Sequence, residues 1–399
     1  MNQYTTFIAL DAHKKEHKVA MILNNAATLE HWTIRNTDRE IKRMVRQIKA
    51  KSHGPVLVCY EAGVCGFALQ RQIATNGVDC QVVAPSLIPV KPGERVKTDR
   101  RDAAKLVKLL QADMLTQVQP PTPQQESARD LCRCRQAAQE DLGRIRHQIL
   151  KFLLRRGYHY RDGSHWTQKH LQWLKGIRLP EPIDQVVLAE YVSDFQHRLA
   201  RLKRVTQLLE DVSRQAPYAT PVGWLRCFCG IDTVTALTVV SELYSFERFG
   251  SPRQLMSYLG LTPSEYSSGE SERKGGLTKA GNRRVRRLLI EAAWHQRHRP
   301  VASKALKQRR QGQSPEVIAI AERCHKRLHQ RYWYLLHTGK PPQKVTAAIA
   351  RELVGFLWAV LYRPPAVVSA KACGTASGLD GGPTARGPSD PNCPPVAPI

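Results

Sequence analysis

The order of short apolar runs and helical spacings in the first hundred residues constrains the fold more than any other feature of the sequence. Short apolar runs predict strands, whereas apolar residues at intervals of three and four predict helices. The expected strands are 6–10, 17–23, 28–34, 56–60 and 80–84, and the expected helices are 39–51, 67–75 and one that begins at Asp99. The short connections among the first three strands predict an antiparallel meander, followed by β-α-β-α.

Acidic residues stand at the ends of two of these strands and at the start of the last helix. This order of elements is typical of a ribonuclease-H-like α/β fold, in which Asp11 would end the first strand and Glu61 the fourth. Asp99 and Asp102 lie three residues apart, so a helix presents both on one face. Four carboxylates in one pocket repel one another unless cations neutralise them, which predicts a site for two Mg²⁺ ions. Capping of the helix is the alternative explanation for Asp99 and Asp102.

The chain is strongly basic, with 61 Lys and Arg against 34 Asp and Glu and a formal net charge of +27. Such an excess opposes compactness unless a polyanion offsets it, so nucleic acid is the expected partner. Residues 273–310 carry 13 basic side chains and one acid, Glu291, which predicts polyanion contact chiefly in the C-terminal half. We also expect nucleic-acid contacts from the basic residues around the Asp99 pair, namely Arg95, Lys97, Arg100 and Arg101.

Two apolar runs, one near each end of the chain, are both too short to cross a membrane. Residues 7–10 are too few for a signal peptide, and residues 353–362 are about half of the ~20 that a spanning helix needs. We therefore expect no membrane partner and a bacterial cytoplasmic location, at the nucleoid when the protein acts. The ten cysteines lack zinc-binding spacing and are expected to be reduced thiols.

The middle of the chain is expected to be a long helical pair. Apolar stripes over 131–152 and 188–209 predict two antiparallel helices, packed either within one chain or across a dimer. Residues 224–243 then resemble a helix-hairpin-helix, a module that holds DNA phosphates through backbone amides. Asp232 occupies the position of the usual second glycine, so the module is open to a structural role here.

A Ser- and Gly-rich loop follows at 259–281 and leads into a basic helix. A serine in such a loop is either a phosphate ligand or a nucleophile, and no histidine adjoins it as a base. Further helices at 301–312, 315–338 and 342–362 predict a mostly α-helical C-terminal domain. The residues expected to contact nucleic acid here are Lys274, Lys279, Asn282, Arg283, Arg286 and Arg287.

Two motif blocks, in this order and separation, resemble the insertion-sequence-110 transposases, particularly the 1111 subgroup. The first block comprises Asp11, Glu61 and Lys97-Thr98-Asp99-x-x-Asp102-Ala103. The second comprises Gly260-Leu261-Thr262-Pro263, Ser268-Gly269 and Leu277-Thr278-Lys279-Ala280-Gly281-Asn282. The resemblance spans roughly residues 5–362.

The resemblance implies three segments: a RuvC-like domain with the four acids (1–118), a linker and helical coiled coil (119–215), and a transposase domain with a catalytic serine (216–363). Residues 364–399 match nothing in the family, and their 8 Pro and 5 Gly with few apolar residues predict a disordered tail. The resemblance also implies a recombinase that moves an insertion sequence through a phosphoserine intermediate. Carried over by position, the nucleophile is Ser268, with Ser267 as the serious rival.

The implied partners are double-stranded donor and target DNA, a structured guide RNA encoded by the element, and further copies of the chain in a dimer or tetramer. A base-free serine can be activated by metal, and about 166 residues separate Asp102 from Ser268. We therefore expect Ser268 of one subunit to meet the four acids of another. Two alternatives to the recombinase function are a RuvC-like, Mg²⁺-dependent hydrolytic junction resolvase and a non-catalytic nucleic-acid-binding module.

Overall fold

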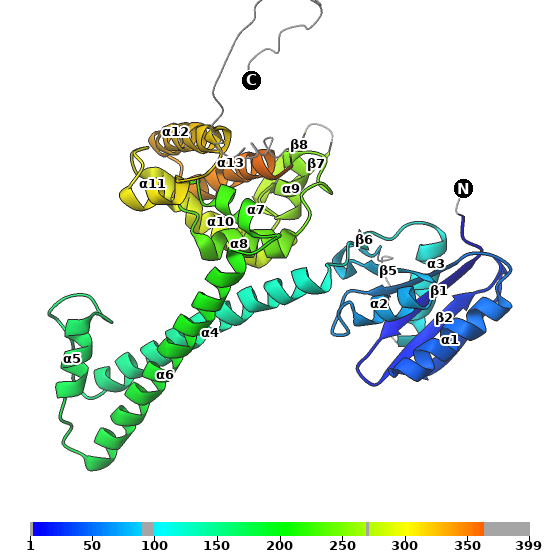
Figure 1. The fold of residues 1–399 in the computed structure, drawn as a ribbon, viewed down its shortest axis with the longest axis horizontal. Helices are drawn as coiled ribbons and strands as arrows, with labels where there is room; N and C mark the ends of the chain where they lie inside the picture. The colour runs from blue at the N-terminus through cyan, green and yellow to red at the C-terminus, as the bar shows by residue number, and fades with distance from the viewer. Residues whose placement is uncertain (1–2, 90–98, 269–270, 363–399) are drawn as a thin grey trace, which may run out of the picture.

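A computed structural model describes residues 3–89, 99–268 and 271–362, apart from the side chains of residues 99, 100, 271, 272 and 274. Three parts are distinct in space: an α/β part at the N-terminus, a long arm of paired helices, and a helical part that carries a small hairpin (Figure 1). The expected tail, 364–399, lies outside the described residues.

The N-terminal part contains a six-stranded mixed sheet in the order β3-β2-β1-β4-β5-β6. β1 pairs antiparallel with β2 and β2 with β3, which confirms the expected meander. β4 and β5 then add parallel strands beside β1. The short β6, which the sequence did not predict, pairs antiparallel with β5. The strands are β1 Thr6–Ala12, β2 Glu16–Ile22, β3 Leu29–Arg35, β4 Val56–Glu61, β5 Asp79–Val83 and β6 Gln117–Val118.

Helices cover both faces of this sheet because successive strand residues point to opposite sides. One set of strand side chains, including Ile8, Val58 and Val82, packs with helices α1 (Asp38–Lys51) and α2 (Ala68–Thr75). The other set, including Phe7 and Leu57, packs with helix α3 (Asp99–Gln111). The architecture is consistent with a ribonuclease-H-like α/β fold.

The arm consists of α4 (Pro123–Leu154) and α6 (Pro182–Ser213), which run antiparallel and pack along their length (Figure 1). α4 begins with a capping box, in which Thr122 and Gln125 each accept a hydrogen bond from the other's backbone amide. At the far end, α5 (Gln168–Gly176) closes an aromatic cluster around the buried side chain of His170. The two apolar stripes therefore meet within one chain.

The C-terminal part is mostly helical, as predicted, and its apolar residues form the largest core of the described chain. Residues 263–277, expected to be an open loop, instead form the hairpin of β7 (Pro263–Ser268) and β8 (Ser271–Leu277). The helices are α7 Ala219–Leu225, α8 Thr233–Leu243, α9 Pro252–Tyr258, α10 Arg283–Trp294, α11 Lys304–Arg310, α12 Pro315–His337 and α13 Pro342–Tyr362.

Helix α13 is long and apolar enough to meet the criteria for a membrane span. Its apolar side chains, among them Ile349, Leu353 and Leu357, are nevertheless buried in the C-terminal core. It packs against α9, α10 and α12. This burial agrees with the sequence-based expectation of a core helix.

Candidate active site and its surroundings

Asp11 and Glu61 lie on neighbouring parallel strands at the same edge of the sheet. Leu10 is in register with Tyr60, so the next residue of each strand is the acid. Ala9 and Cys59, two residues earlier, are buried on the sheet face that α3 covers. Because strand side chains alternate with a period of two, Asp11 and Glu61 point to that same face.

Helix α3, which carries the third acid, packs on this face. Ala103, Leu106 and Val107 are buried against the sheet, which fixes the helix over β1 and β2. Asp102 precedes Ala103 in the first turn of α3 and is partly exposed. Asp99 begins the same helix, but its side chain lies outside the described residues, as does that of Arg100. Asp11 and Glu61 thus point to the sheet face on which α3, the helix that carries Asp102, packs.

These carboxylates supply the hard oxygen ligands that Mg²⁺ prefers. Among the described residues, however, no three His, Cys, Asp or Glu side chains are grouped closely enough to hold a metal ion. Asp11 contacts His13, with 3.2 Å between Oδ2 and Nε2. The donor chemistry and the shared face therefore fit a divalent metal, while the described side chains do not form a closed ligand set.

His17 belongs to β2 and is close in sequence to Asp11. Its side chain is fully buried. Burial lowers its pKa, so the neutral imidazole is favoured. His17 pairs with Ala12 across the β1–β2 ladder, and Ala12 packs with the core under α1 and α2. It therefore faces away from the side on which Asp11 points.

Ser268 is exposed at the last described position of β7, where it pairs with Ser271. Ser267, its rival, donates a hydrogen bond from Oγ to Oε1 of Glu265 at 3.0 Å. Ser267 and Glu265 therefore share one side of the strand, and Ser268 points to the other. The carboxylate next to Ser267 is a local base that the sequence had not indicated.

The base of the hairpin is fixed by backbone packing and by the start of α10. Gly281 has φ +62°, and a Cβ atom there would lie 1.8 Å from the carbonyl oxygen of Tyr258. Asn282 caps α10 by accepting hydrogen bonds from the amides of Arg284 and Val285. Its Nδ2 atom donates to Oε2 of Glu242 at 2.8 Å. Asn282, expected to contact nucleic acid, has a structural role in this geometry.

The other predicted nucleic-acid contacts divide by exposure. Lys279, Arg283 and Arg287 are exposed around the start of α10, and Arg101 is exposed beside Asp102. Arg286 is buried, and its Nη1 atom donates to the carbonyl oxygens of Leu259 at 2.8 Å and Ala280 at 2.5 Å. The expectation that Arg286 faces nucleic acid is therefore wrong, since a basic helix that packs on a core must bury one side. Arg95, Lys97 and the side chains of Arg100 and Lys274 lie outside the described residues.

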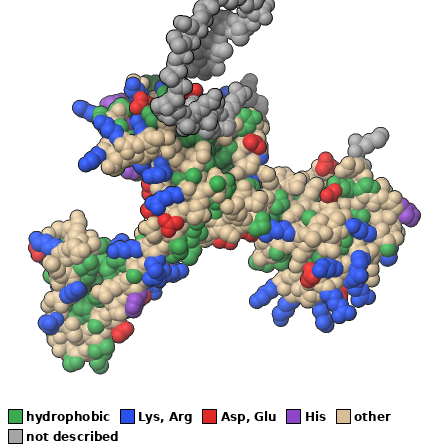
Figure 2. Space-filling model, in the orientation of Figure 1, with side chains coloured by type: hydrophobic (Ala, Val, Ile, Leu, Met, Phe, Trp, Pro, Cys, Tyr) green, Lys and Arg blue, Asp and Glu red, His purple; other side chains and the backbone are tan. Residues whose placement is uncertain are grey.

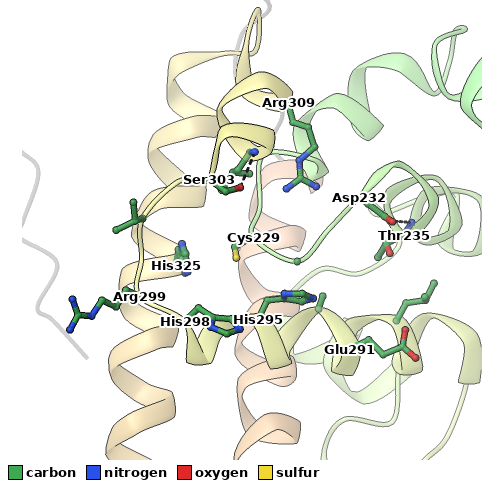
Figure 3. Close-up of a pocket in the computed structure, with 15 residues that line it drawn as sticks. Cys229, Asp232, Thr235, Glu291, His295, His298, Arg299, Ser303, Arg309 and His325 are labelled. Carbon is green, nitrogen blue, oxygen red and sulfur yellow. Dashed lines mark hydrogen bonds between the residues drawn. The ribbon is translucent and has the colours of Figure 1, made fainter. Parts of the chain in front are cut away.

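The structure gives Asp232, in the segment that resembles a helix-hairpin-helix, a role as a helix cap. Asp232 is the N-cap of α8, and its Oδ1 atom accepts a hydrogen bond from the amide of Thr235 at 2.7 Å. The loop before α8, with Cys229, Gly230 and Asp232, borders a cavity of about 540 Å³ (Figure 3). Arg309, His298 and His325 line this cavity together with Asp232 and other residues. Acids and bases are mixed in its wall, so its charge does not select a polyanion.

The two predicted halves of the site lie in different parts of the chain. The acids belong to the N-terminal α/β part, whereas the β7–β8 hairpin projects from the C-terminal helical part (Figure 1). Within one chain the structure does not bring Ser268 to the acids.

Comparison with known proteins gives the family. Residues 8–157 match the family model DEDD_Tnp_IS110, described as a transposase, and residues 224–308 match the Transposase IS116/IS110/IS902 family. A putative transposase, y4qE, of Sinorhizobium fredii is 40% identical over 356 residues, covering 89% of this chain and 88% of the relative. This chain belongs to the IS110 transposase family.

Other members support the assignment. The transposase for insertion sequence element IS1533 of Leptospira borgpetersenii is 30% identical over 82% of this chain and 95% of its own length. The transposase for element IS1111A of Coxiella burnetii is 25% identical over 59% of this chain and 65% of its own length. Membership of the IS110 family implies DNA transposase activity on an insertion sequence, and DEDD transposases generally use divalent metals.

Proposed function

We propose that this chain is an RNA-guided DNA recombinase that excises and inserts its own element through a phosphoserine at Ser268. The supporting observation is that Asp11 and Glu61 point to the sheet face on which α3, the helix that carries Asp102, packs, while Ser268 is exposed on a separate hairpin. Asp99, which shares the first turn of α3 with Asp102, is the fourth acid of the proposal. The N-terminal part would then be RuvC-like, and the relatives include a transposase of an IS1111 element.

In the proposed reaction, Oγ of Ser268 loses its proton and forms a bond to the scissile phosphorus. The bond from phosphorus to the leaving deoxyribose oxygen breaks, and that oxygen takes up a proton. A free hydroxyl of the second strand then attacks the phosphorus and releases Ser268, so each phosphodiester broken is replaced by one formed. Two Mg²⁺ ions bound by the four acids would activate the attacking oxygen and stabilise the leaving oxygen.

The remaining residues orient the nucleic acid. Arg95, Lys97, Arg100 and Arg101 flank the acids in sequence and would guide the scissile phosphate toward them. Lys279, Arg283 and Arg287 are exposed around the start of α10, which follows the hairpin in sequence, and with Lys274 they would hold the phosphates next to the serine. Both sets act through charge and do not read bases.

We further propose that a complete site forms between subunits, because Ser268 and the acids lie in separate parts of one chain. A dimer or tetramer would place the hairpin of one subunit against the sheet edge of another. The domains of the proposal are 1–118, 119–215, 216–363 and the tail 364–399. The net charge of +27 suits a complex that holds a structured guide RNA together with donor and target DNA. In such a complex base pairing selects the sequence, while the protein contacts the backbone.

Mixing two inactive variants tests the shared site. Asp11→Ala removes an acid from one subunit, and Ser268→Ala removes the nucleophile from another. Each variant alone should leave excision below detection, while their mixture should recover part of the wild-type activity because some sites combine an intact sheet with an intact serine. A mixture as inactive as either variant contradicts the shared site. Cleavage that Ser268→Ala leaves intact supports the hydrolytic resolvase instead.

A further inference from the structure

Helix α1 and the turn between β1 and β2 form one basic surface on the N-terminal part. Seven exposed cations belong to this surface, which we name the α1 basic face: Lys14, Lys15, Arg35, Arg39, Lys42, Arg43 and Arg46. Figure 2 shows Lys and Arg side chains gathered along the lower edge of this part, where α1 and the turn lie. The surface belongs to the half of the chain in which the sequence predicted less polyanion contact.

The core fixes the direction in which this surface faces. Ile41, Met44, Val45 and Ile48 of α1 are buried against the sheet. The cations at 39, 42, 43 and 46 follow the complementary spacing of three, four and seven, so they share the outward face. At 1.5 Å per residue they span about 10 Å, over which a DNA duplex presents about six phosphate charges.

The α1 basic face reaches the edge at which the acids lie. The β1–β2 turn follows Asp11 directly and carries Lys14 and Lys15. Asn36 holds this turn against the start of α1: its Nδ2 atom donates to the carbonyl oxygens of His13 at 3.4 Å and Lys14 at 3.2 Å. Its backbone amide donates to the carbonyl oxygen of Lys15 at 2.9 Å. The turn that follows Asp11 therefore adjoins the start of α1, which packs on the sheet face opposite to the one to which Asp11 points.

Repulsion among the cations of α1 distinguishes the α1 basic face from an ordinary solvated surface. Like charges three or four residues apart destabilise a helix, and a surface kept only for solubility mixes both signs more evenly. Asp38 lies 2.8 Å from Lys42, and Glu40 lies 4.0 Å from Arg43. These two acids offset two of the seven cations, so the surface keeps an excess of positive charge.

We propose that the α1 basic face binds the phosphate backbone of the DNA duplex that flanks the cleavage site. The duplex would extend from the acidic edge over Lys14 and Lys15 and along α1, held without regard to base sequence. The proposal takes from the proposed function only that cleavage occurs at the acidic edge. Binding requires neither Ser268 nor a metal ion.

The test measures binding of a labelled duplex of about 30 base pairs to the full-length chain in EDTA, from about 50 to about 200 mM salt. The variant Arg39→Gln, Lys42→Gln, Arg43→Gln and Arg46→Gln removes four cations from exposed positions. Each lost phosphate contact makes the slope of log K against log salt shallower by about 0.9, so we expect a change of about 2 to 3. Affinity at about 100 mM salt should fall at least ~10-fold.

Two controls keep the result specific. Arg39→Lys with Arg43→Lys and Arg46→Lys retains the charge and should bind within about threefold of wild type. Asp38→Asn with Glu40→Gln removes the local acids and should tighten binding. An unchanged slope and affinity in the four-Gln variant, with its helix content intact by circular dichroism, overturns the proposal. The proposal is also overturned if the four-Gln variant loses binding to structured RNA while its duplex binding is unchanged. Because cleavage is not measured, either failure is separate from a failure of the proposed function.

Discussion

Arg133 of α4 holds both carboxylate oxygens of Glu242 in α8, with Nε to Oε1 at 2.8 Å and Nη2 to Oε2 at 3.0 Å. The side chain of Glu242 is 2% exposed. Its Oε2 atom also accepts a hydrogen bond from Asn282, the residue that caps α10. One buried carboxylate thus connects the helical arm, the helix-hairpin-helix and the base of the serine hairpin.

Glu242→Ala should destabilise the C-terminal part because it removes the acceptor of two side chains. The half-buried guanidinium of Arg133 and the side-chain amide of Asn282 both donate to Glu242. Removing one partner of a buried pair costs about 3–5 kcal/mol, and partial exposure of Arg133 reduces this to about 2–4 kcal/mol. Urea unfolding of the full chain measures the change. Glu210→Ala, at a partly exposed position of the same arm, is the control and should change the unfolding free energy by less than about 0.5 kcal/mol.

The Glu242 contribution should also depend on pH. Burial acts to raise the pKa of Glu242, but hydrogen bonds and charge from Arg133 and a hydrogen bond from Asn282 outweigh it, so the pKa lies below the usual 4.5. A depressed carboxyl pKa stabilises the fold above the unfolded-state value, and this stabilisation is lost as pH falls through the folded-state value. The stability gap between wild type and Glu242→Gln should therefore narrow below about pH 4.5. A gap that widens on acidification would contradict the assignment.

Arg286 and Arg287 are adjacent but should respond differently to substitution. Arg286→Met leaves the carbonyl oxygens of Leu259 and Ala280 without their donor, which should cost about 2–3 kcal/mol. Arg287→Met removes only an exposed ion pair with Glu291 and should change stability by less than about 0.5 kcal/mol. Thermal unfolding of both variants checks the difference. Equal effects would show that Arg286 does not support the turn before α10.

Gly281→Ala should disrupt the base of the hairpin. The left-handed backbone at φ +62° and the 1.8 Å approach of a Cβ atom to the Tyr258 carbonyl leave no room for a side chain. We expect a loss of at least about 3 kcal/mol and of excision activity. Gly276→Ala is the matched control, since nothing lies within 4 Å of its Cβ position. Wild-type melting of Gly281→Ala would contradict this account.

The arrangement of the sheet could be predicted because its determinants are local. Apolar runs with short connections identified β1 to β5, and the residue after each buried run identified Asp11 and Glu61. The two-residue strand β6 carries too little pattern to be found. Residues 263–277 lack the apolar alternation of a buried strand, since β7 is exposed along most of its length, so the hairpin was expected to be a loop.

The roles of single polar residues were harder to predict because they depend on distant partners. Arg286 and Arg287 look alike in a basic helix, and only packing shows which one is buried. The partner of Glu242 is 109 residues away, so no local pattern signals it. Asp232 did carry a signal, since an acid before Thr233-Val234-Thr235 fits a helix N-cap.

Removal of metal should separate cleavage from binding. EDTA, or Asp102→Asn, should lower strand cleavage by at least about 100-fold while duplex binding changes by less than about threefold. Glu16→Gln makes the same change of charge close to the β1–β2 turn, at an exposed residue paired with Lys18, and should retain activity. Cleavage that continues in EDTA would contradict a role for the acids in holding metal.

Detection of a covalent protein–DNA adduct after denaturation tests the central proposal most directly. Labelled substrate DNA is incubated with guide RNA, Mg²⁺ and wild type, Ser268→Ala or Ser267→Ala, then separated on a denaturing gel. We predict an adduct with wild type and Ser267→Ala, and none with Ser268→Ala. An adduct lost only in Ser267→Ala would assign the reaction to the serine beside Glu265. Cleavage without any adduct would contradict the phosphoserine mechanism.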